Sequence, residues 1–151
     1  MITIEEFKNK ITKKSRLIGL DLGEKRIGIA ISNDNQSIAT PYKTVQKDNF
    51  NKFLDELKLI ISENNIEGII VGNPINMDGS LGPSAQSVKD VCLNILKNIN
   101  IPLCLWDERL STVGAFNLSS QIDTKVSKKI KKIDENAAAF ILQGALDYLK
   151  N

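Results

Sequence analysis

The segment that most constrains the fold spans residues 17–32, where two apolar runs rich in Ile and Leu flank a short charged turn. The turn contains Gly23, which can adopt the positive φ of a tight reversal. The pattern predicts a β-hairpin over about residues 16–32 that opens a buried sheet. Asp21 stands near the end of the first run. A carboxylate at the end of a buried strand is costly unless it is paired or binds a metal, so Asp21 is the first candidate functional residue.

Length and composition limit the class of protein. The chain has 151 residues, of which 42% are hydrophobic and 25% are charged, as is typical of one soluble globular domain. The formal net charge is only +2, so contact with nucleic acid must depend on local clusters of Lys and Arg. No apolar run approaches the ~20 residues that span a membrane, and the polar N-terminus does not resemble a signal peptide.

The Cys and His content narrows the chemistry. Cys92 and Cys104 lie on apolar segments without CxxC spacing, which predicts buried free thiols and a cytoplasmic location. The chain contains no His. This excludes the Ser-His-Asp and Cys-His arrangements and most zinc sites. For a hydrolase, the simplest remaining chemistry is that of carboxylates with hard divalent cations.

The rest of the chain alternates between strand and helix patterns. Residues 1–15 are expected to form an N-terminal extension, either a short helix with capping-box spacing between Thr3 and Glu6 or a loosely held tail. The further elements expected are a strand at 37–45 with Pro41 at a sheet edge, a helix at 48–64 capped by Asp48, a strand at 66–71, a helix at 84–98, a strand at 101–106, a helix from Ser111 or Thr112 to about Ser119, and a last helix from Asp134.

This order of elements predicts an α/β fold. Strands that are separated by helices usually pair in parallel, whereas strands joined by short turns pair antiparallel. We therefore expect one five-stranded mixed sheet, made of a three-strand antiparallel meander plus two parallel strands, with helices on both faces.

Acidic residues far apart in the sequence are expected to meet at one edge of this sheet. Asp21 ends the first strand, Asp107 and Glu108 end the last, and Asp134 begins the C-terminal helix. Ligands of open α/β sheets bind at the carboxyl ends of the parallel strands. Clustered carboxylates there favour Mg²⁺ or Mn²⁺, and two such ions about 4 Å apart would suit phosphodiester hydrolysis. Strand alternation admits only one of Asp107 and Glu108 to the active face and leaves the choice open.

Each candidate also has a purely structural interpretation. Asp21 could be an ordinary turn residue, because Asp-x-Gly suits a hairpin. Asp134 could be no more than a helix N-cap. The segment 121–132 carries five Lys and one Asp, which fits a solvated loop as well as a clamp on a nucleic-acid backbone.

Four segments resemble, in order, the motifs of the YqgF family, also called RuvX. They are DLGEKRIGIA at 21–30, VGNPINMDG at 71–79, DERLST at 107–112 and KIDENAA at 132–138. The resemblance covers residues 16–149 and implies that residues 16–151 form a single RNase H-like nuclease domain related to the RuvC resolvases. It also implies that Asp21, Glu108 and Asp134 are the catalytic residues and the ligands of a divalent metal, Mg²⁺ or Mn²⁺. The first fifteen residues exceed the usual family pattern.

The resemblance implies hydrolysis of phosphodiester bonds in nucleic acid. The expected activity is maturation of the 5′ end of the small-subunit ribosomal RNA precursor in the bacterial cytoplasm, with structured RNA and pre-ribosomal particles as partners. Two alternatives stay open, a Holliday-junction resolvase acting on branched DNA and a non-catalytic assembly factor that binds nucleic acid. A phosphotransferase of the actin–hexokinase type is disfavoured, because it needs two such domains. No membrane partner is expected, and a monomer and a homodimer are both compatible with the sequence.

Seven cations are candidates for contact with nucleic acid. They lie either beside a proposed metal ligand or in the Lys-rich segment before Asp134, where they would bind phosphate without reading sequence. They are Lys25, Arg26, Arg109, Lys128, Lys129, Lys131 and Lys132.

Overall fold

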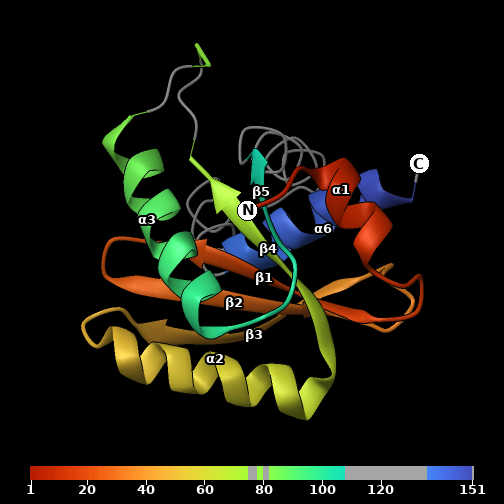
Figure 1. Ribbon diagram of the computed structural model, residues 1–151, viewed down its shortest axis with the longest axis horizontal. Helices are drawn as coiled ribbons and strands as arrows, with labels where there is room; N and C mark the ends of the chain where they lie inside the picture. Colours follow the sequence, from red (N-terminus) through yellow and green to blue (C-terminus); the bar gives the residue numbers. More distant parts are fainter. Residues whose placement is uncertain (75–77, 80–81, 108–135, 151) are drawn as a thin grey trace, which may run out of the picture.

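A computed structural model describes residues 1–74, 78–79, 82–107 and 136–150. Five strands form one sheet in the order β3-β2-β1-β4-β5 (Figure 1). β1 pairs antiparallel with β2, which pairs antiparallel with β3, whereas the β1–β4 and β4–β5 pairs are parallel. The predicted mixed sheet is therefore confirmed. The strands are β1 (Arg16–Leu22), β2 (Arg26–Ser32), β3 (Ala39–Gln46), β4 (Ile66–Asn73) and β5 (Leu103–Asp107).

Helices cover both faces of the sheet, as predicted. α2 and α3 pack with one apolar cluster, and α1 and α6 pack with the other. Figure 1 shows α6 passing on the far side of the sheet from α3. No helix in the described part of the chain is long and apolar enough to cross a membrane. The helix expected near 111–119 lies outside the described residues. The described helices are α1 (Ile4–Lys10), α2 (Phe50–Asn64), α3 (Pro83–Asn98) and α6 (Ala137–Leu149).

Alternation along β1 assigns its side chains to the two faces. Ile18 and Leu20 belong to the cluster under α2 and α3, and Leu17 belongs to the cluster under α6. Side chains of a strand point to opposite faces in turn. Gly19 and Asp21 therefore lie on the face that α6 covers.

The hairpin between β1 and β2 forms as expected, but the reason for its glycine differs from the prediction. Positive φ among the described glycines occurs at Gly79, not at Gly23. A Cβ on Gly23 would lie 2.7 Å from the carbonyl oxygen of Arg26, and the Gly23 amide donates to that same oxygen at 3.0 Å. Gly23 is thus required by a close backbone approach across the turn rather than by a left-handed conformation.

Residues 1–15 contribute to the packed structure. The predicted short helix is present, with Thr3 and Glu6 forming a complete capping box. Phe7 is fully buried, and its ring fills the space left by the missing side chain of Gly68 on β4. The amide of Ile2 donates to the carbonyl of Leu103 at 3.2 Å, so the N-terminus covers the outer edge of β5. The segment is not a loosely held tail.

Two helices begin later than predicted. Asn49, rather than Asp48, is the N-cap of α2, and its side-chain oxygen accepts from the Lys52 amide. The N-cap of α6 is Asn136 rather than Asp134. In both places the sequence offers two good capping residues close together, and propensity alone does not choose between them.

Cys92 and Cys104 are free thiols with fully buried side chains, as predicted. Burial raises the pKa of both thiols to about 12. At pH 8 only about one thiol in 10⁴ is therefore ionised. We expect the folded protein to react with an aromatic disulfide reagent (DTNB) far more slowly than free cysteine does, and both thiols to react fully in denaturant. Fast labelling of either thiol in the folded protein would contradict this.

Candidate active site

Asp21 lies at the carboxyl end of β1, the central strand of the sheet. Its backbone is opposite Gly28 of β2, which in turn is opposite Thr44 of β3. Directly opposed residues share a face of the sheet. Asp21 is half-buried, and Gly28 beside it has no side chain. The Asp21 carboxylate therefore borders a space that its neighbours leave open.

Two glycines bring the start of α6 close to Asp21. A Cβ on Gly19 would lie 2.7 Å from Leu142 Cβ and 3.1 Å from the Ala138 carbonyl oxygen, so α6 can cross β1 only over a glycine. At Gly28 an added Cβ would lie 3.5 Å from Ala138 Cβ and 3.7 Å from Asp21 Cβ. The first turn of α6 thus stands above β1 and β2, next to the carboxylate.

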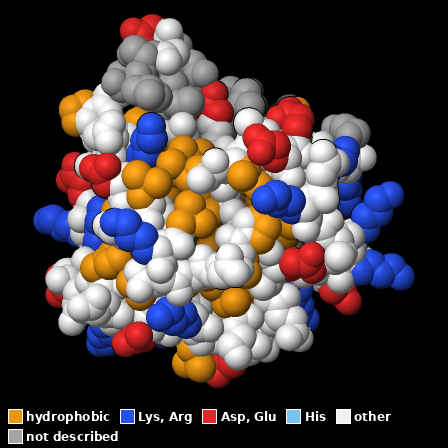
Figure 2. Space-filling model, viewed as in Figure 1, with side chains coloured by type: hydrophobic (Ala, Val, Ile, Leu, Met, Phe, Trp, Pro, Cys, Tyr) orange, Lys and Arg blue, Asp and Glu red, His pale blue; other side chains and the backbone are white. Residues whose placement is uncertain are grey.

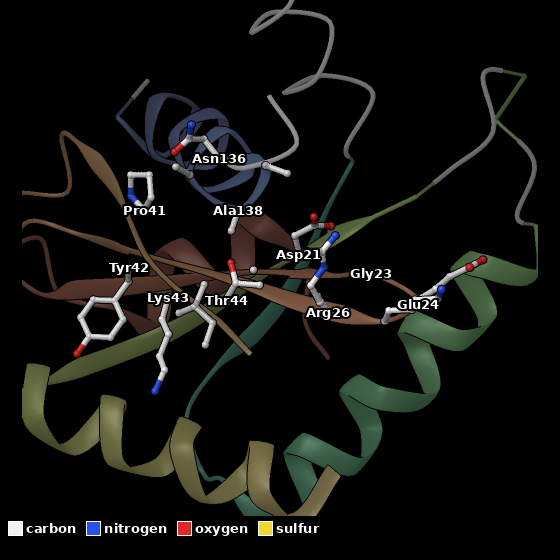
Figure 3. Close-up of a pocket in the computed structure, with 15 residues that line it drawn as sticks. Asp21, Gly23, Glu24, Arg26, Pro41, Tyr42, Lys43, Thr44, Asn136 and Ala138 are labelled. Carbon is white, nitrogen blue, oxygen red and sulfur yellow. The ribbon is translucent and has the colours of Figure 1, made fainter. Parts of the chain in front are cut away.

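A cleft of about 600 Å³ opens between these elements. Figure 3 shows its floor on the hairpin strands and its far wall at the start of α6. Asp21, Arg26 and Gly28 line it from the first two strands, and Thr44 lines it from β3. Asn136 and the three alanines that follow it complete the lining from α6.

Cations line the cleft that the Asp21 carboxylate borders. Lys25 and Arg26 are exposed and line the cleft. Figure 3 shows the Arg26 side chain directed toward Asp21, while the Glu24 carboxylate points away from it. Lys43 also lines the cleft but forms an ion pair with Glu56 at 3.5 Å. The cleft can therefore accept an anionic group beside Asp21.

The structure brings together Asp21, Lys25 and Arg26 from the predicted set. The other predicted site residues lie outside the described residues: Glu108, Arg109, Lys128, Lys129, Lys131, Lys132 and Asp134. Among the described residues, no group of three potential ligands gathers that could hold a metal. Asp21 itself fits a ligand of a hard cation, because it offers a carboxylate at the border of an open, polar cleft.

Sequence reasoning did not name five polar residues that line the cleft as site residues: Glu24, Tyr42, Lys43, Thr44 and Asn136. Thr44 gave no signal, since its position depends on the register of β3 against β2. Asn136 lies inside the fourth motif, residues 132–138, but the residue types of that motif suggested only the start of a helix. The position of Asn136 at the N-cap of α6, beside the cleft, could have been inferred from that motif.

The sheet order and the carboxylate at the end of its central strand define an RNase H-like fold. Solved structures with this fold include Thermus thermophilus RuvC in complex with a Holliday-junction substrate, with a TM-score of 0.57 and 11% identity over 91% of this chain and 96% of RuvC. The yeast mitochondrial Holliday-junction resolvase Ydc2 has a TM-score of 0.53 and 11% identity over 97% of this chain and 84% of Ydc2. At such low identity these similarities establish the fold alone.

The chain belongs to the RuvX family, whose model, described as "Holliday junction resolvase", matches residues 15–148. A protein of Pelagibacter ubique named "Putative pre-16S rRNA nuclease" is 69% identical over the full length of both chains. A protein of Ruegeria pomeroyi with the same name is 42% identical over 99% of this chain and 97% of its own. The prediction of a nuclease, a hydrolase acting on ester bonds, is thereby confirmed.

Proposed function

We propose that this protein is a metal-dependent nuclease that matures the 5′ end of the small-subunit ribosomal RNA precursor in the cytoplasm. The observation that carries the proposal is Asp21, a carboxylate at the end of the central strand that borders an open cleft with cations beside it. The names of the full-length relatives point to the same substrate. Pre-ribosomal particles would then be the natural partners.

Strand alternation supports Glu108 rather than Asp107 as a second ligand. Cys104 and Trp106 belong to the apolar cluster on the face of α6, and Leu103 belongs to the opposite cluster. By the same alternation Asp107 belongs to the face opposite Asp21. Glu108 follows it directly in the chain. β5 lies two strands from β1, a separation of about 10 Å, which leaves room for metal between the two strand ends.

The start of α6 supports Asp134 as the third ligand. Asn136 lines the cleft that contains Asp21, and Asp134 precedes it by two residues. A divalent ion held by these carboxylates would activate water and stabilise the leaving oxygen of a phosphodiester. Arg26, directed toward Asp21, would orient the phosphate and offset the charge that develops on it. We assign a phosphate-contact role also to Lys25, to Arg109 and to Lys128, Lys129, Lys131 and Lys132.

A second candidate function is resolution of Holliday junctions. The description of the family model favours it, and so does the shared fold with RuvC. A resolvase makes two symmetric cuts and therefore acts best as a dimer. If the protein is a monomer and cleaves RNA, this would favour the RNA nuclease over the resolvase.

The test is single-turnover cleavage in Mg²⁺ or Mn²⁺ of two substrates in parallel, precursor small-subunit rRNA and a four-way DNA junction. We expect cleavage of the RNA at its 5′ leader and loss of cleavage in EDTA. Cleavage of the junction alone would replace the proposal with the resolvase function. Binding of RNA without cleavage in either metal would indicate instead an assembly factor that binds nucleic acid and does not cleave it.

A further inference from the structure

A second groove, of about 550 Å³, lies at the other end of α6. The end of α1 and the loop after it form one side, the β2–β3 turn forms another, and the end of α6 closes it. Lys8, Lys13 and Lys150 line this groove together with Gln36. The proposed function makes no use of this part of the molecule.

The chain beside the groove is strongly basic. Residues 8–16, called the basic segment below, contain five cations and no acid. Four of them are exposed and form no ion pair with any residue in the described ranges: Lys10, Lys13, Lys14 and Arg16. Unneutralised cations at this density attract a polyanion.

The acids close to the basic segment are bonded to neutral groups. Glu67 accepts from the amide and the hydroxyl of Thr12 at 2.8 and 3.0 Å. Glu5 accepts from the Tyr148 hydroxyl at 2.7 Å, and Asp147 accepts from the Gln143 side chain at 3.0 Å. Asp34, on the β2–β3 turn, is exposed. These carboxylates keep their negative charge and, with Glu6, number five against the six cations of the basic segment and Lys150, so the local excess of positive charge is small and the cations are concentrated in the basic segment itself.

Hydrogen bonds, two of them buried, hold the basic segment in place. Gln36 is buried at a φ of 56°, and its side-chain amide donates to the carbonyls of Thr12 and Ser15 and to the Ser15 hydroxyl, at 2.8 to 2.9 Å. The two bonds from Thr12 to Glu67 fix the same loop from β4. Lysines that serve only to keep a loop solvated do not need hydrogen bonds that fix the loop. A fixed cationic loop loses less conformational entropy on binding.

The part of the basic segment on α1 lies on the same side of the sheet as the candidate active site. α1 and α6 share one apolar cluster, and α6 runs from the cleft at Asn136 to the groove at Lys150. Its 13 residues span about 20 Å, which is about six nucleotide steps along one strand of B-form duplex. Figure 2, viewed as in Figure 1, shows Lys and Arg side chains projecting on the right, among other places, and Figure 1 places α1 and the C-terminus on that side.

We propose that the basic segment and Lys150 bind the phosphate backbone of the nucleic-acid substrate about 20 Å from the cleft. This inference rests on the proposed nuclease function, since both sites would contact one strand along α6. The family model match begins at residue 15, so most of the segment lies outside it. The exposed cations and the polar lining of the groove match phosphates rather than an apolar partner.

The test compares RNA binding by two variants with equal loss of charge. One is Lys10→Gln/Lys13→Gln/Lys14→Gln/Arg16→Gln. The control removes four exposed lysines from α2 and α3, on the opposite face of the sheet: Lys52→Gln/Lys58→Gln/Lys89→Gln/Lys97→Gln. We expect the first variant to bind an RNA of about 20 nucleotides at least ten-fold more weakly, with a salt slope smaller by about 3. The control should bind like the wild type.

Two further measurements locate the contact. With an RNA of two nucleotides, which is too short to span the two sites, the first variant should bind like the wild type. Gln36→Asn keeps a residue that tolerates positive φ but shortens the amide that holds the loop. It should weaken binding of the long RNA several-fold without changing the salt slope, because the number of cations is unchanged.

Each failure has a distinct meaning. An unchanged salt slope in the first variant, or equal weakening of both variants, overturns the contact surface, while cleavage by the wild type still supports the proposed function. The contact surface is also overturned if the first variant binds the long and the short RNA equally more weakly than the wild type does. Loss of binding to phosphatidylserine vesicles with unchanged RNA affinity would assign the segment to a membrane surface instead. If the first variant has a smaller salt slope but the wild type cleaves neither substrate, the contact surface is supported and the nuclease proposal is rejected.

Discussion

Replacing Asp21 by Asn should lower the single-turnover rate of RNA cleavage by about 10³-fold or more. Asn has the same size as Asp but lacks the negative charge that a hard divalent cation requires. The half-buried position of Asp21 at the end of β1 tolerates this isosteric change, so the thermal midpoint should stay within a few degrees of the wild type. The measurements are quenched-flow cleavage in Mn²⁺ and thermal unfolding of both proteins.

The matched control for this variant is Glu24→Gln. Glu24 lines the same cleft and loses the same charge, but its carboxylate points away from Asp21. It should retain most of the activity. Equal losses in the two variants would mean that the net charge of the cleft matters rather than a specific ligand. Full activity of Asp21→Asn would remove Asp21 from the mechanism.

Replacing Phe7 by Ala should destabilise the protein by about 3–5 kcal/mol. The Phe7 side chain is fully buried between α1 and β4, and its removal leaves a cavity beside Gly68. For a chain of this size the thermal midpoint should fall by about 10 °C. Phe50→Ala is the control, because Phe50 loses the same ring from a half-buried position at the start of α2 and should cost clearly less. Equal midpoints for wild type and Phe7→Ala would mean that α1 does not stabilise the domain.

A double-mutant cycle would show that Phe7 acts through Gly68. A Cβ on Gly68 would lie 2.8 Å from Phe7 Cε2, so Gly68→Ala should destabilise the wild type. In the Phe7→Ala background the added methyl group enters the vacated space, and its cost should shrink or change sign. Additive effects would contradict this direct contact.

The hairpin, the mixture of antiparallel and parallel strands and the helices on both faces could be predicted because each follows from a local pattern. The alternating apolar runs before and after Asp21 specify strands, and the helical spacing in α2 and α3 specifies crossovers that make neighbouring strands parallel. The capping box of Thr3 and Glu6 indicated a short helix as one of two alternatives for residues 1–15, and α1 is that helix.

The features that could not be predicted depend on contacts between distant parts of the chain. The docking of α1 requires the space above Gly68, which follows Phe7 by 61 residues in sequence, and no local pattern reports that space. The role of Gly23 was misjudged because glycine serves both for positive φ and for close approach, and the sequence does not distinguish them. The place of Thr44 in the cleft depends on the register between β2 and β3.

The wall of the cleft at the start of α6 also sets when, during synthesis, the enzyme becomes complete. Asp21 is translated before Asn136 and the alanines that face it across the cleft, because Asn136 follows Asp21 by 115 positions in the chain. Chains emerge from the ribosome amino end first, and the sheet cannot acquire α6 before then. A nascent chain that ends before residue 136 carries Asp21 without this wall. The cleft is therefore complete only after residues 136–139 have been synthesised and have packed against the sheet.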